Sequence, residues 1–298
     1  MRARVLINAK AGAILGLDKA QVETDVTQIF HTHGHSALVS CVPAEHLATE
    51  LEIAAQDPGY NTLIIGGGDG SVRLAAKYAM ENAKTLGILP LGTMNLLAKD
   101  LNMPLDLHAA ASALCSGEVR FVDVASVNGN IYLCNSMMGL PPKFAARRQS
   151  LRGRPLLERI AGYFDILRRM LASRAQLTIS LEDGAQERKL RVMSVAVANN
   201  SYADTAQFGL SRPRLDEGHL TVYASRHTSG WDLAMGFARA LFGSWKGDPM
   251  ISQFTAERFT LRTSAHRVKL SNDGEVEDFQ TPLRYEIRAR ALKLLVPA

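Results

Sequence analysis

An apolar stretch that runs into a cluster of glycines constrains this chain more than any other feature. Residues 63–65 read Leu-Ile-Ile, the segment Gly66-Gly67-Gly68-Asp69-Gly70-Ser71 follows directly, and a helical pattern covers 72–83. Glycines let the backbone approach a ligand closely and present several N–H groups at once. The N-terminus of the following helix adds a partial positive charge. The pattern predicts a strand, a phosphate-binding loop and a helix, and Asp69 predicts that a cation, Mg²⁺, accompanies the phosphate.

A second loop of the same kind follows about twenty residues later. Residues 86–91 predict a strand, and Gly92-Thr93-Met94-Asn95 opens a predicted helix over 96–101. Thr93 is suited both to cap this helix and to reach a phosphate oxygen. Loops that follow consecutive parallel strands lie at the same edge of a sheet, so we expect the two loops to line one crevice. Together they predict a site for a magnesium-bound nucleotide.

Length and composition set broad limits. A chain of 298 residues exceeds one typical domain, which predicts two. No apolar run reaches about eighteen residues, and the N-terminus enters a strand pattern at once, so we expect a cytoplasmic protein without a signal peptide. The three cysteines (Cys41, Cys115 and Cys134) are widely spaced and form no C-x-x-C pair, which is typical of a reducing compartment.

The order of predicted elements divides the chain. Residues 1–120 alternate strands (4–8, 36–41, 61–65, 86–89) with helices (18–33, 43–56, 72–83, 96–101, 105–116), which predicts an α/β domain with a parallel sheet. Residues 121–283 are rich in strands and predict a β-sandwich, with helices near 156–171 and 231–242. Its predicted strands are a hairpin (119–127 and 131–137, turn 128–130) and the segments 176–181, 189–199, 219–224, 254–263, 267–270 and 284–288. The tail 284–298 is free to pack back on the first domain.

The segment Asp273-Gly274-Glu275 is the candidate for acid–base chemistry. Phosphoryl transfer needs charge neutralisation on the transferred group and an aligned nucleophile. A carboxylate on a tight turn is a suitable base for an attacking hydroxyl. The alternative is an ordinary acidic hairpin turn, and the two phosphate loops favour the first interpretation.

Positive charge is concentrated between residues 143 and 174. This segment carries net +7 while the whole chain carries +5, so the remainder carries −2. Its cations are Lys143, Arg147, Arg148, Arg152, Arg154, Arg159, Arg168, Arg169 and Arg174, and an apolar helical stripe runs through Leu156, Ile160, Tyr163, Phe164, Leu167 and Leu171. A basic amphipathic helix predicts contact with an anionic membrane surface. The alternative is a stripe packed on the sandwich with its arginines in water. Nucleic acid is disfavoured because no recognised binding module is present.

Taken together, the motifs resemble the diacylglycerol kinase catalytic domain family of soluble bacterial lipid kinases, related to sphingosine and ceramide kinases. The resemblance covers nearly the whole chain. It rests on 67–71, 90–98, 215–220, 273–275 with Thr281-Pro282, and the ending 291–297. It implies a nucleotide site in the cleft between an NAD-kinase-like domain and a C-terminal β-sandwich.

The resemblance also implies roles for single residues. ATP would be held by Gly67, Gly68, Asp69, Gly70, Ser71, Gly92, Thr93, Asn95 and Ser40, with Asp69 also among the catalytic residues. Glu275 would be the proton acceptor, and Asp273 would orient the magnesium and water network. A structural Mg²⁺ would be held by the carbonyls of Arg214 and His219 and by the carboxylate of Glu217. The chain departs from the family at Ala9, Val72-Arg73, Leu96, Glu217 and 203–205.

The expected function is therefore an ATP- and Mg²⁺-dependent lipid kinase that phosphorylates the hydroxyl of diacylglycerol or a similar neutral lipid, peripherally bound to the membrane. A ceramide or sphingoid base is the alternative acceptor. NAD kinases and phosphofructokinases also use such glycine loops, but their other signatures are missing. The family's Asn-Glu pair is replaced by Val72-Arg73, so a catalytically inactive lipid- or nucleotide-binding protein is a further alternative. Formation of a homodimer is also left open.

Overall fold

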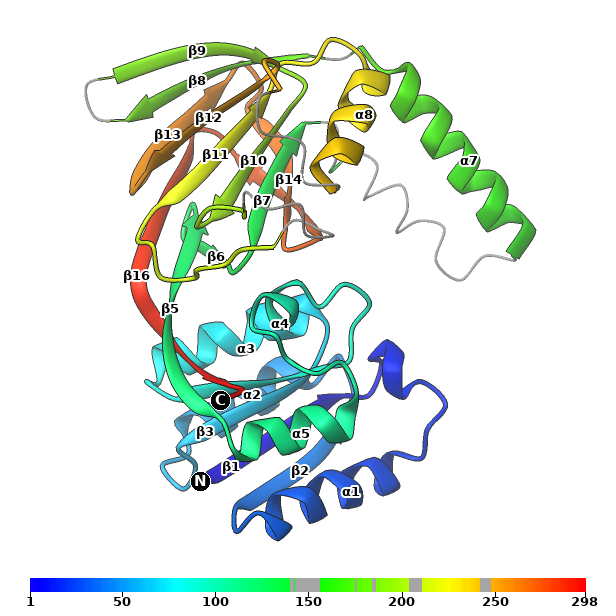
Figure 1. Ribbon diagram of the computed structural model, residues 1–298, viewed down its shortest axis with the longest axis vertical. Coiled ribbons are helices and arrows are strands. Elements are labelled where there is room, and N and C mark those ends of the chain that lie inside the picture. Colours follow the sequence, from blue (N-terminus) through cyan, green and yellow to red (C-terminus); the bar gives the residue numbers. More distant parts are fainter. Residues whose placement is uncertain (140–141, 143–155, 175, 184–185, 204–210, 242–247) are drawn as a thin grey trace. The chain divides into compact units, whose positions relative to one another are not determined.

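A computed structural model describes residues 1–139, 142, 156–174, 176–183, 186–203, 211–241 and 248–298. The chain forms two compact units: unit 1 comprises Met1–Val124 and Ala289–Ala298, and unit 2 comprises Ala125–Arg288 (Figure 1). The predicted domains divide instead at 120/121 and 283/284. Residues 284–288 of the predicted tail belong to unit 2, and the remainder belongs to unit 1.

Unit 1 is a parallel sheet between two layers of helices. Strands β2 (Ser36–Val42), β1 (Arg2–Asn8), β3 (Thr62–Gly67) and β4 (Thr85–Pro90) lie in this order and are all parallel. Helices α1 (Lys19–Thr32) and α5 (Leu107–Cys115) cover one face, and α2 (Leu47–Gln56) and α3 (Asp69–Glu81) cover the other (Figure 1). Every residue of β3 is buried, as its uninterrupted apolar sequence predicts. The predicted α/β class is confirmed.

Local sequence explains most helix boundaries in unit 1. Asp18 and Asp106 cap α1 and α5 by accepting backbone N–H bonds from Ala20 and Ala109. The predicted start of the second helix at residue 43 is wrong. The His46 amide bonds to the Pro43 carbonyl in a preceding turn, and α2 begins at Leu47.

Unit 2 contains two layers of antiparallel strands, which confirms the predicted β-sandwich. One sheet has the order β12-β11-β10-β7-β14-β15, from strands Ile251–Ala256, Leu220–Ser225, Ser194–Asn199, Asn135–Gly139, Arg267–Asn272 and Glu275–Gln280. The other includes β13 (Arg258–Thr263), β8 (Leu177–Asp183), β9 (Gln186–Val192) and β6 (Asn130–Tyr132). Apolar side chains from both layers form one core, among them Val197, Val222, Leu261 and Leu270.

Three predicted strands are in fact pairs of strands that belong to different sheets. The segment 189–199 is β9 and β10, separated by Met193, and 254–263 is β12 and β13, separated by Glu257. The segment 131–137 likewise divides into β6 and β7. One or two residues suffice for the crossing between sheets, so the apolar pattern continues through it. Strand β15 was not predicted, because its sequence, EVEDFQ, has only two apolar residues.

Two strands run from one unit into the other: β5 (Glu118–Val127) and β16 (Leu283–Val296). The last part of β16 pairs in parallel with β4 through Lys293 and Leu294. Helices α7 (Leu156–Ala172) and α8 (Gly230–Leu241) belong to unit 2 and contact each other. None of the helices in the described part of the chain combines the length and apolar character that a bilayer crossing requires.

Candidate functional site

The topological switch point of unit 1 lies between β1 and β3. From β1 the chain proceeds to β2 on one side and afterwards to β3 and β4 on the other. Ligands of open parallel sheets bind outside the carboxyl ends of the strands at such a point. Asn8 ends β1, and its side-chain amide donates to Ser71 Oγ in the first turn of α3 at 3.1 Å. The glycine loop after β3 is therefore fixed to the end of the neighbouring strand.

The two glycine loops of unit 1 meet backbone to backbone. A Cβ on Gly92 would overlap the Cα of Gly68 and lie 2.8 Å from Asn95 Oδ1. Asp69 adds a second connection, because its Oδ1 accepts a hydrogen bond of 2.7 Å from the Leu96 amide. The two loops thus contact each other directly, as their positions in the sequence predict.

The side chain that caps α4 (Leu96–Asp100) is Asp69 and not the expected Thr93. The sequence favours Thr93 as the capping side chain, but the residue before the helix is Asn95, which makes no capping bond. The acceptor for the first helical amide comes instead from Asp69 in the other loop. Thr93 is exposed.

Asn95 closes the second loop through its own side chain. Its Oδ1 accepts from the Gly92 amide at 2.9 Å, and its Nδ2 donates to the carbonyls of Pro90 and Gly92 at 3.2 and 2.9 Å. Its backbone is left-handed, with φ of 50°, a conformation that asparagine tolerates better than most residues. Asn95 is 8% exposed, so these bonds make it the internal support of the loop.

We expect Asn95→Asp to destabilise unit 1 by about 1–3 kcal/mol. A carboxylate retains the acceptor for the Gly92 amide but cannot donate to the two carbonyls, which would then face a negative charge. Chemical denaturation monitored by circular dichroism measures the change. Asn82→Ala is the matched control, since the Asn82 side-chain amide makes one bond of 2.9 Å to the Tyr78 carbonyl at a helix end. Equal stability of Asn95→Asp and the wild type would contradict the role of Asn95.

Ser40 lies apart from the two loops along the sheet. It belongs to β2, which is separated from β3 by β1. Its hydroxyl accepts a bond of 3.0 Å from Arg4 Nη1, and the same nitrogen donates to the Leu38 carbonyl. Contact between Ser40 and nucleotide stays a prediction.

The Asp-Gly-Glu segment forms the turn between β14 and β15 in unit 2. Asp273 and Gly274 have φ of 49° and 88°, and Asn272 pairs with Glu275 across the turn. Two central residues with positive φ are typical of a type I′ hairpin turn. Glu275 is the first residue of β15 and is exposed. The turn therefore presents this carboxylate to solvent.

The Asp273 side chain points away from solvent. It is 5% exposed, and its carboxylate accepts backbone N–H bonds from Leu133 (2.7 Å), Cys134 (2.8 Å) and Asn135 (3.0 Å). The Asp273 amide in turn donates to the Asn135 carbonyl at 2.9 Å. These bonds attach the turn to the link between β6 and β7. They give Asp273 a structural task, and its predicted role toward magnesium stays a prediction.

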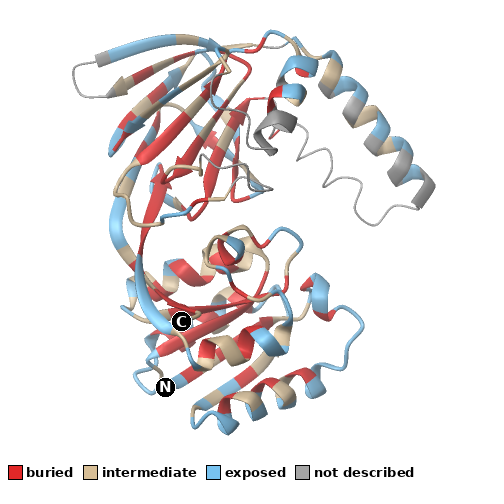
Figure 2. Cartoon of the chain, viewed as in Figure 1, coloured by how far each residue is buried: buried red, intermediate tan, exposed pale blue. Residues whose placement is uncertain are grey.

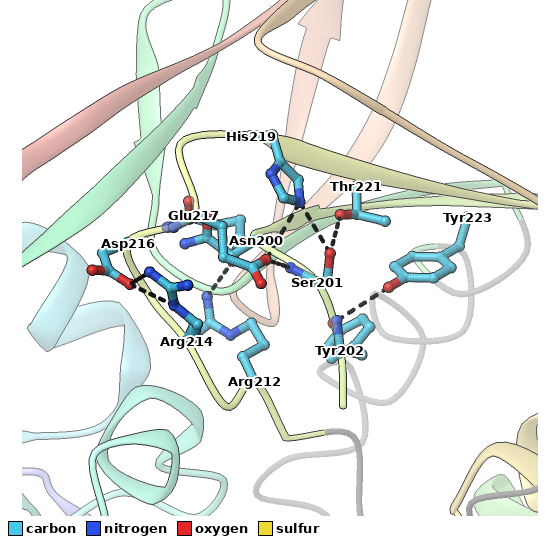
Figure 3. A network of polar contacts seen from close by, with 11 residues as sticks. Asn200, Ser201, Tyr202, Arg212, Arg214, Asp216, Glu217, His219, Thr221 and Tyr223 are labelled. Atoms are coloured by element: carbon cyan, nitrogen blue, oxygen red, sulfur yellow. Dashed lines mark hydrogen bonds and ion pairs between the residues drawn. The ribbon is translucent and has the colours of Figure 1, made fainter. Parts of the chain in front are cut away.

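The loop expected to hold a structural Mg²⁺ is closed by the chain's own groups (Figure 3). Glu217 Oε2 accepts from the Ser201 amide at 2.9 Å and lies 3.3 Å from His219 Nε2. The His219 carbonyl accepts from the Asn200 amide at 3.1 Å. Arg214 forms an ion pair of 3.1 Å with Asp216.

These contacts hold the loop together without a metal ion. Glu217 Oε2 and the His219 carbonyl, two of the expected ligands, each accept a hydrogen bond from a backbone amide of the chain. Within the described part of the chain, no three His, Cys, Asp or Glu side chains lie close enough to hold a metal ion. Glu217 and His219 lie together in a hydrogen-bonded network, Arg214 pairs with Asp216, and the structural Mg²⁺ at these residues stays a prediction.

We therefore expect chelation to leave the stability of unit 2 unchanged. A ligand that binds only the folded state raises the unfolding temperature as its concentration rises. Thermal unfolding in excess EDTA and in millimolar Mg²⁺, without nucleotide, should agree within about 1 °C. His219→Ala, which removes the partner of Glu217, should lower the unfolding temperature in both buffers. A rise that depends on Mg²⁺ concentration would establish a metal site.

Two residues of these networks were not predicted from the sequence. Asn8 was given no role, although an asparagine at the end of a predicted strand was a usable signal. Arg212 is buried beside the Asp-Gly-Glu turn, and one arginine among many offers no signal in the sequence. The basic residues at 143, 147, 148, 152 and 154 lie outside the described residues, as does the Arg159 side chain. Arg168, Arg169 and Arg174 are exposed.

Comparison with known proteins gives consistent results over both units. The sequence profile of the diacylglycerol kinase catalytic domain matches residues 2–127, and that of the YegS C-terminal NAD kinase beta sandwich-like domain matches 146–296. A Pseudomonas aeruginosa protein named "Probable lipid kinase YegS-like" is 40% identical over 90 residues, which is 30% of each chain. A Yersinia pestis protein of the same name is 39% identical over 83 residues, 26% of this chain and 28% of the relative.

Solved structures extend the similarity to the whole fold. A crystal structure of a diacylglycerol kinase from Bacillus anthracis superposes with a TM-score of 0.69 at 17% identity and covers 99% of this chain and 96% of its own. A second crystal structure from that organism has a TM-score of 0.76 at 19% identity, covering 99% and 97%. At these identities the similarity establishes the two-domain fold.

Proposed function

Because the chain belongs to the diacylglycerol kinase catalytic domain family, we propose that it is an ATP-dependent lipid kinase. It transfers the γ-phosphate to a hydroxyl group of diacylglycerol or a similar neutral lipid. The matches to curated relatives named as lipid kinases cover 26–30% of this chain and 28–30% of the relatives' own length, so this activity is an inference for the whole protein.

The contact between the two glycine loops is the observation that carries the proposal. Gly68 and Gly92 approach closely only because neither has a side chain. Asp69 bonds the first loop to the second, and Asn95 closes the second loop, at the edge of the sheet where the fold favours ligand binding. Backbone amides in such loops suit the oxygens of a triphosphate.

In the proposed reaction Glu275 is the general base. It accepts the proton of the lipid hydroxyl while the hydroxyl oxygen attacks the γ-phosphorus. The bond from that phosphorus to the bridging β–γ oxygen breaks, and ADP leaves. Catalysis then depends on positioning and on charge stabilisation at the transferred group. The exposed position of Glu275 at the start of β15 supports its access to an external substrate.

Magnesium is proposed as the partner of the nucleotide. A carboxylate such as that of Asp69 is the ligand type that Mg²⁺ prefers. Its Oδ1 bonds to the Leu96 amide, and a carboxylate has about four acceptor positions, so this bond leaves the chemistry compatible with a cation. When bound, Mg²⁺ supplies neutralisation of phosphate charge.

We propose that unit 2 approaches the lipid through α7 and α8. Figure 2 shows exposed positions along both helices. Exposed apolar side chains there support the proposal: Phe164 is 70% exposed, Trp231 57% and Met235 40%. On the predicted apolar stripe, Leu171 is half-buried, and the side chains at 156, 160, 163 and 167 lie outside the described residues. On α7 the exposed Phe164 lies one turn before the exposed Arg168, and Arg168 and Arg169 both pair with Asp165. An exposed aromatic residue next to arginines suits an anionic interface.

We expect Trp231→Ala to weaken binding to anionic vesicles about tenfold, since the indole would no longer enter the interface. Co-sedimentation with phosphatidylglycerol vesicles measures the affinity. Ile53→Ala is the matched control, because Ile53 is similarly exposed (58%) but lies on α2 of unit 1. Equal loss in both variants would contradict a specific role of α8, and insensitivity to salt would exclude a contribution from the arginines.

Radiolabelled ATP with a panel of acceptors tests the proposed function. The wild type is incubated with Mg²⁺ and micelles of diacylglycerol, ceramide or sphingosine, or with NAD. Label in diacylglycerol or another lipid supports the proposal and identifies the acceptor. Label in NAD alone would establish an NAD kinase, and ATP binding without transfer to any acceptor would indicate an inactive relative.

A further inference from the structure

Arg212 is the most deeply buried charged side chain near the Asp-Gly-Glu turn. It is 2% exposed, and its guanidinium donates from Nη1 to the carbonyls of Leu133 (2.6 Å) and Asn199 (2.9 Å). Nη2 donates to Cys134 Sγ at 3.2 Å. Burying a guanidinium is unfavourable unless its donors are satisfied, so an arginine in this place fulfils a definite task.

The Leu133–Asn135 link is held from two sides. Arg212 binds the Leu133 carbonyl and the Cys134 side chain, whereas Asp273 binds the amides of Leu133, Cys134 and Asn135. The cationic guanidinium of Arg212 therefore binds a carbonyl of this link, and the anionic carboxylate of Asp273 binds its amides. Each charge reinforces the hydrogen bonds of the other through the shared backbone.

The surroundings strengthen this coupling because most of them are buried: Tyr132 is 0% exposed and Asn199 is 2% exposed. Burial raises the pKa of Tyr132 well above its ordinary value, and the negative charge of Asp273 raises it further. Burial likewise raises the pKa of Tyr202, whose hydroxyl accepts from Asn135 Nδ2 at 3.0 Å. The phenols are therefore neutral, and charge interactions in this region act at low dielectric.

The same link determines where Glu275 lies. Asp273 is held by three amides and donates its own amide to the Asn135 carbonyl, which fixes the left-handed start of the turn. Gly274 completes the turn and Glu275 follows directly. A shift of the 133–135 backbone would be passed through Asp273 to the Glu275 carboxylate two residues away.

We propose that Arg212 is a positioning residue for Glu275. It touches no reacting group and acts by holding the 133–135 backbone, which anchors Asp273 and hence the turn that carries Glu275. The inference rests on the proposed function for the role of Glu275 as base. The mechanical link from Arg212 to the turn is independent of that role.

The test compares Arg212→Met with Arg262→Met. Methionine removes the charge and the donors at similar length. Arg262 is an exposed arginine of unit 2, paired with Glu182 at 2.6 Å on the other sheet, and serves as the matched control. If Arg212→Met does not fold, Arg212→Lys replaces it, since a single ammonium retains charge but cannot satisfy all three acceptors.

Hydrogen–deuterium exchange examines the mechanical link without any activity. We expect exchange at least about tenfold faster in peptides covering 131–136 and 271–277 of the Arg212 variant, with β8 and β9 and the Arg262 variant unchanged. Acceleration confined to 131–136, or absent from both peptides, would overturn the proposal. Acceleration throughout unit 2 would indicate general loss of structure and would also overturn it.

Kinetics with labelled ATP and the lipid acceptor then test the consequence. We expect kcat of the Arg212 variant to fall about 10²-fold while KM for ATP stays within about twofold. In a Glu275→Gln background the Arg212 substitution should have no further effect, because both changes remove the same function. A further loss of the same factor would overturn the positioning role. Absence of transfer by the wild type would refute the proposed function instead, and the exchange result would still decide the link.

Discussion

Replacing Glu275 by glutamine should lower phosphate transfer by about 10²–10⁴-fold and leave ATP affinity unchanged. Glutamine has the same shape and retains an acceptor oxygen, but it cannot take up the proton of the attacking hydroxyl. Glu275 is exposed and follows the hairpin turn, so its substitution should not disturb the core. Turnover is measured with labelled ATP and lipid micelles, and ATP affinity by isothermal titration calorimetry.

Asp278→Asn is the matched control for this variant. Asp278 is an exposed carboxylate on the same strand, paired with Lys269 at 3.0 Å, and such surface pairs contribute about 0–1 kcal/mol. It should retain wild-type turnover. If Glu275→Gln were as active as Asp278→Asn, another group would have to be the base. If ATP affinity fell together with turnover, Glu275 would belong to the nucleotide site instead.

Gly92→Ala should weaken ATP binding by at least about tenfold, which corresponds to about 1.4 kcal/mol. The added methyl would overlap Gly68 Cα and lie 2.8 Å from Asn95 Oδ1. The Gly68 backbone lies on one side of this methyl, and the Asn95 side chain, which makes three hydrogen bonds, lies on the other. Neither can move without a cost in stability, so the two loops must separate. Their amides would then no longer converge on one triphosphate.

Gly12→Ala tests whether the loss is specific to that contact. A Cβ on Gly12 would meet only the Leu91 carbonyl, at 4.0 Å, an ordinary van der Waals contact. This variant should bind ATP like the wild type. Calorimetry measures the affinity of both variants, and circular dichroism verifies that they are folded. Full affinity in Gly92→Ala would show that the close approach of the loops is unnecessary for binding.

Unit 1 was largely predictable because its signals are local. A buried apolar strand followed by glycines and a helix start is contained within the 63–72 segment, and the same holds for 86–96. Parallel strands connected by helices then bring both loops to one edge of the sheet. The pairing of Asp69 with the Leu96 amide was beyond the sequence, since it joins residues 27 positions apart.

Unit 2 was predictable in class but not in connectivity. Met193 and Glu257 each separate two strands of different sheets, and no glycine or proline marks either position. The hydrogen bonds that anchor Asp273 could not be predicted from the sequence either. Its three bonds reach backbone amides about 140 positions away, and every residue except proline carries such an amide.

The sequence by itself determined the fold class, the two glycine loops and the candidate base, because each depends on residue types within a few positions of one another. The tertiary structure alone decided that Asn95 supports its loop, that Glu217 and His219 pair with each other, and that Arg212 and Asp273 hold one backbone link from opposite sides. The physical reason is that an unpaired polar group is costly when it is buried, so most buried polar groups find a partner. Which partner such a group finds depends on where distant segments meet in the folded chain.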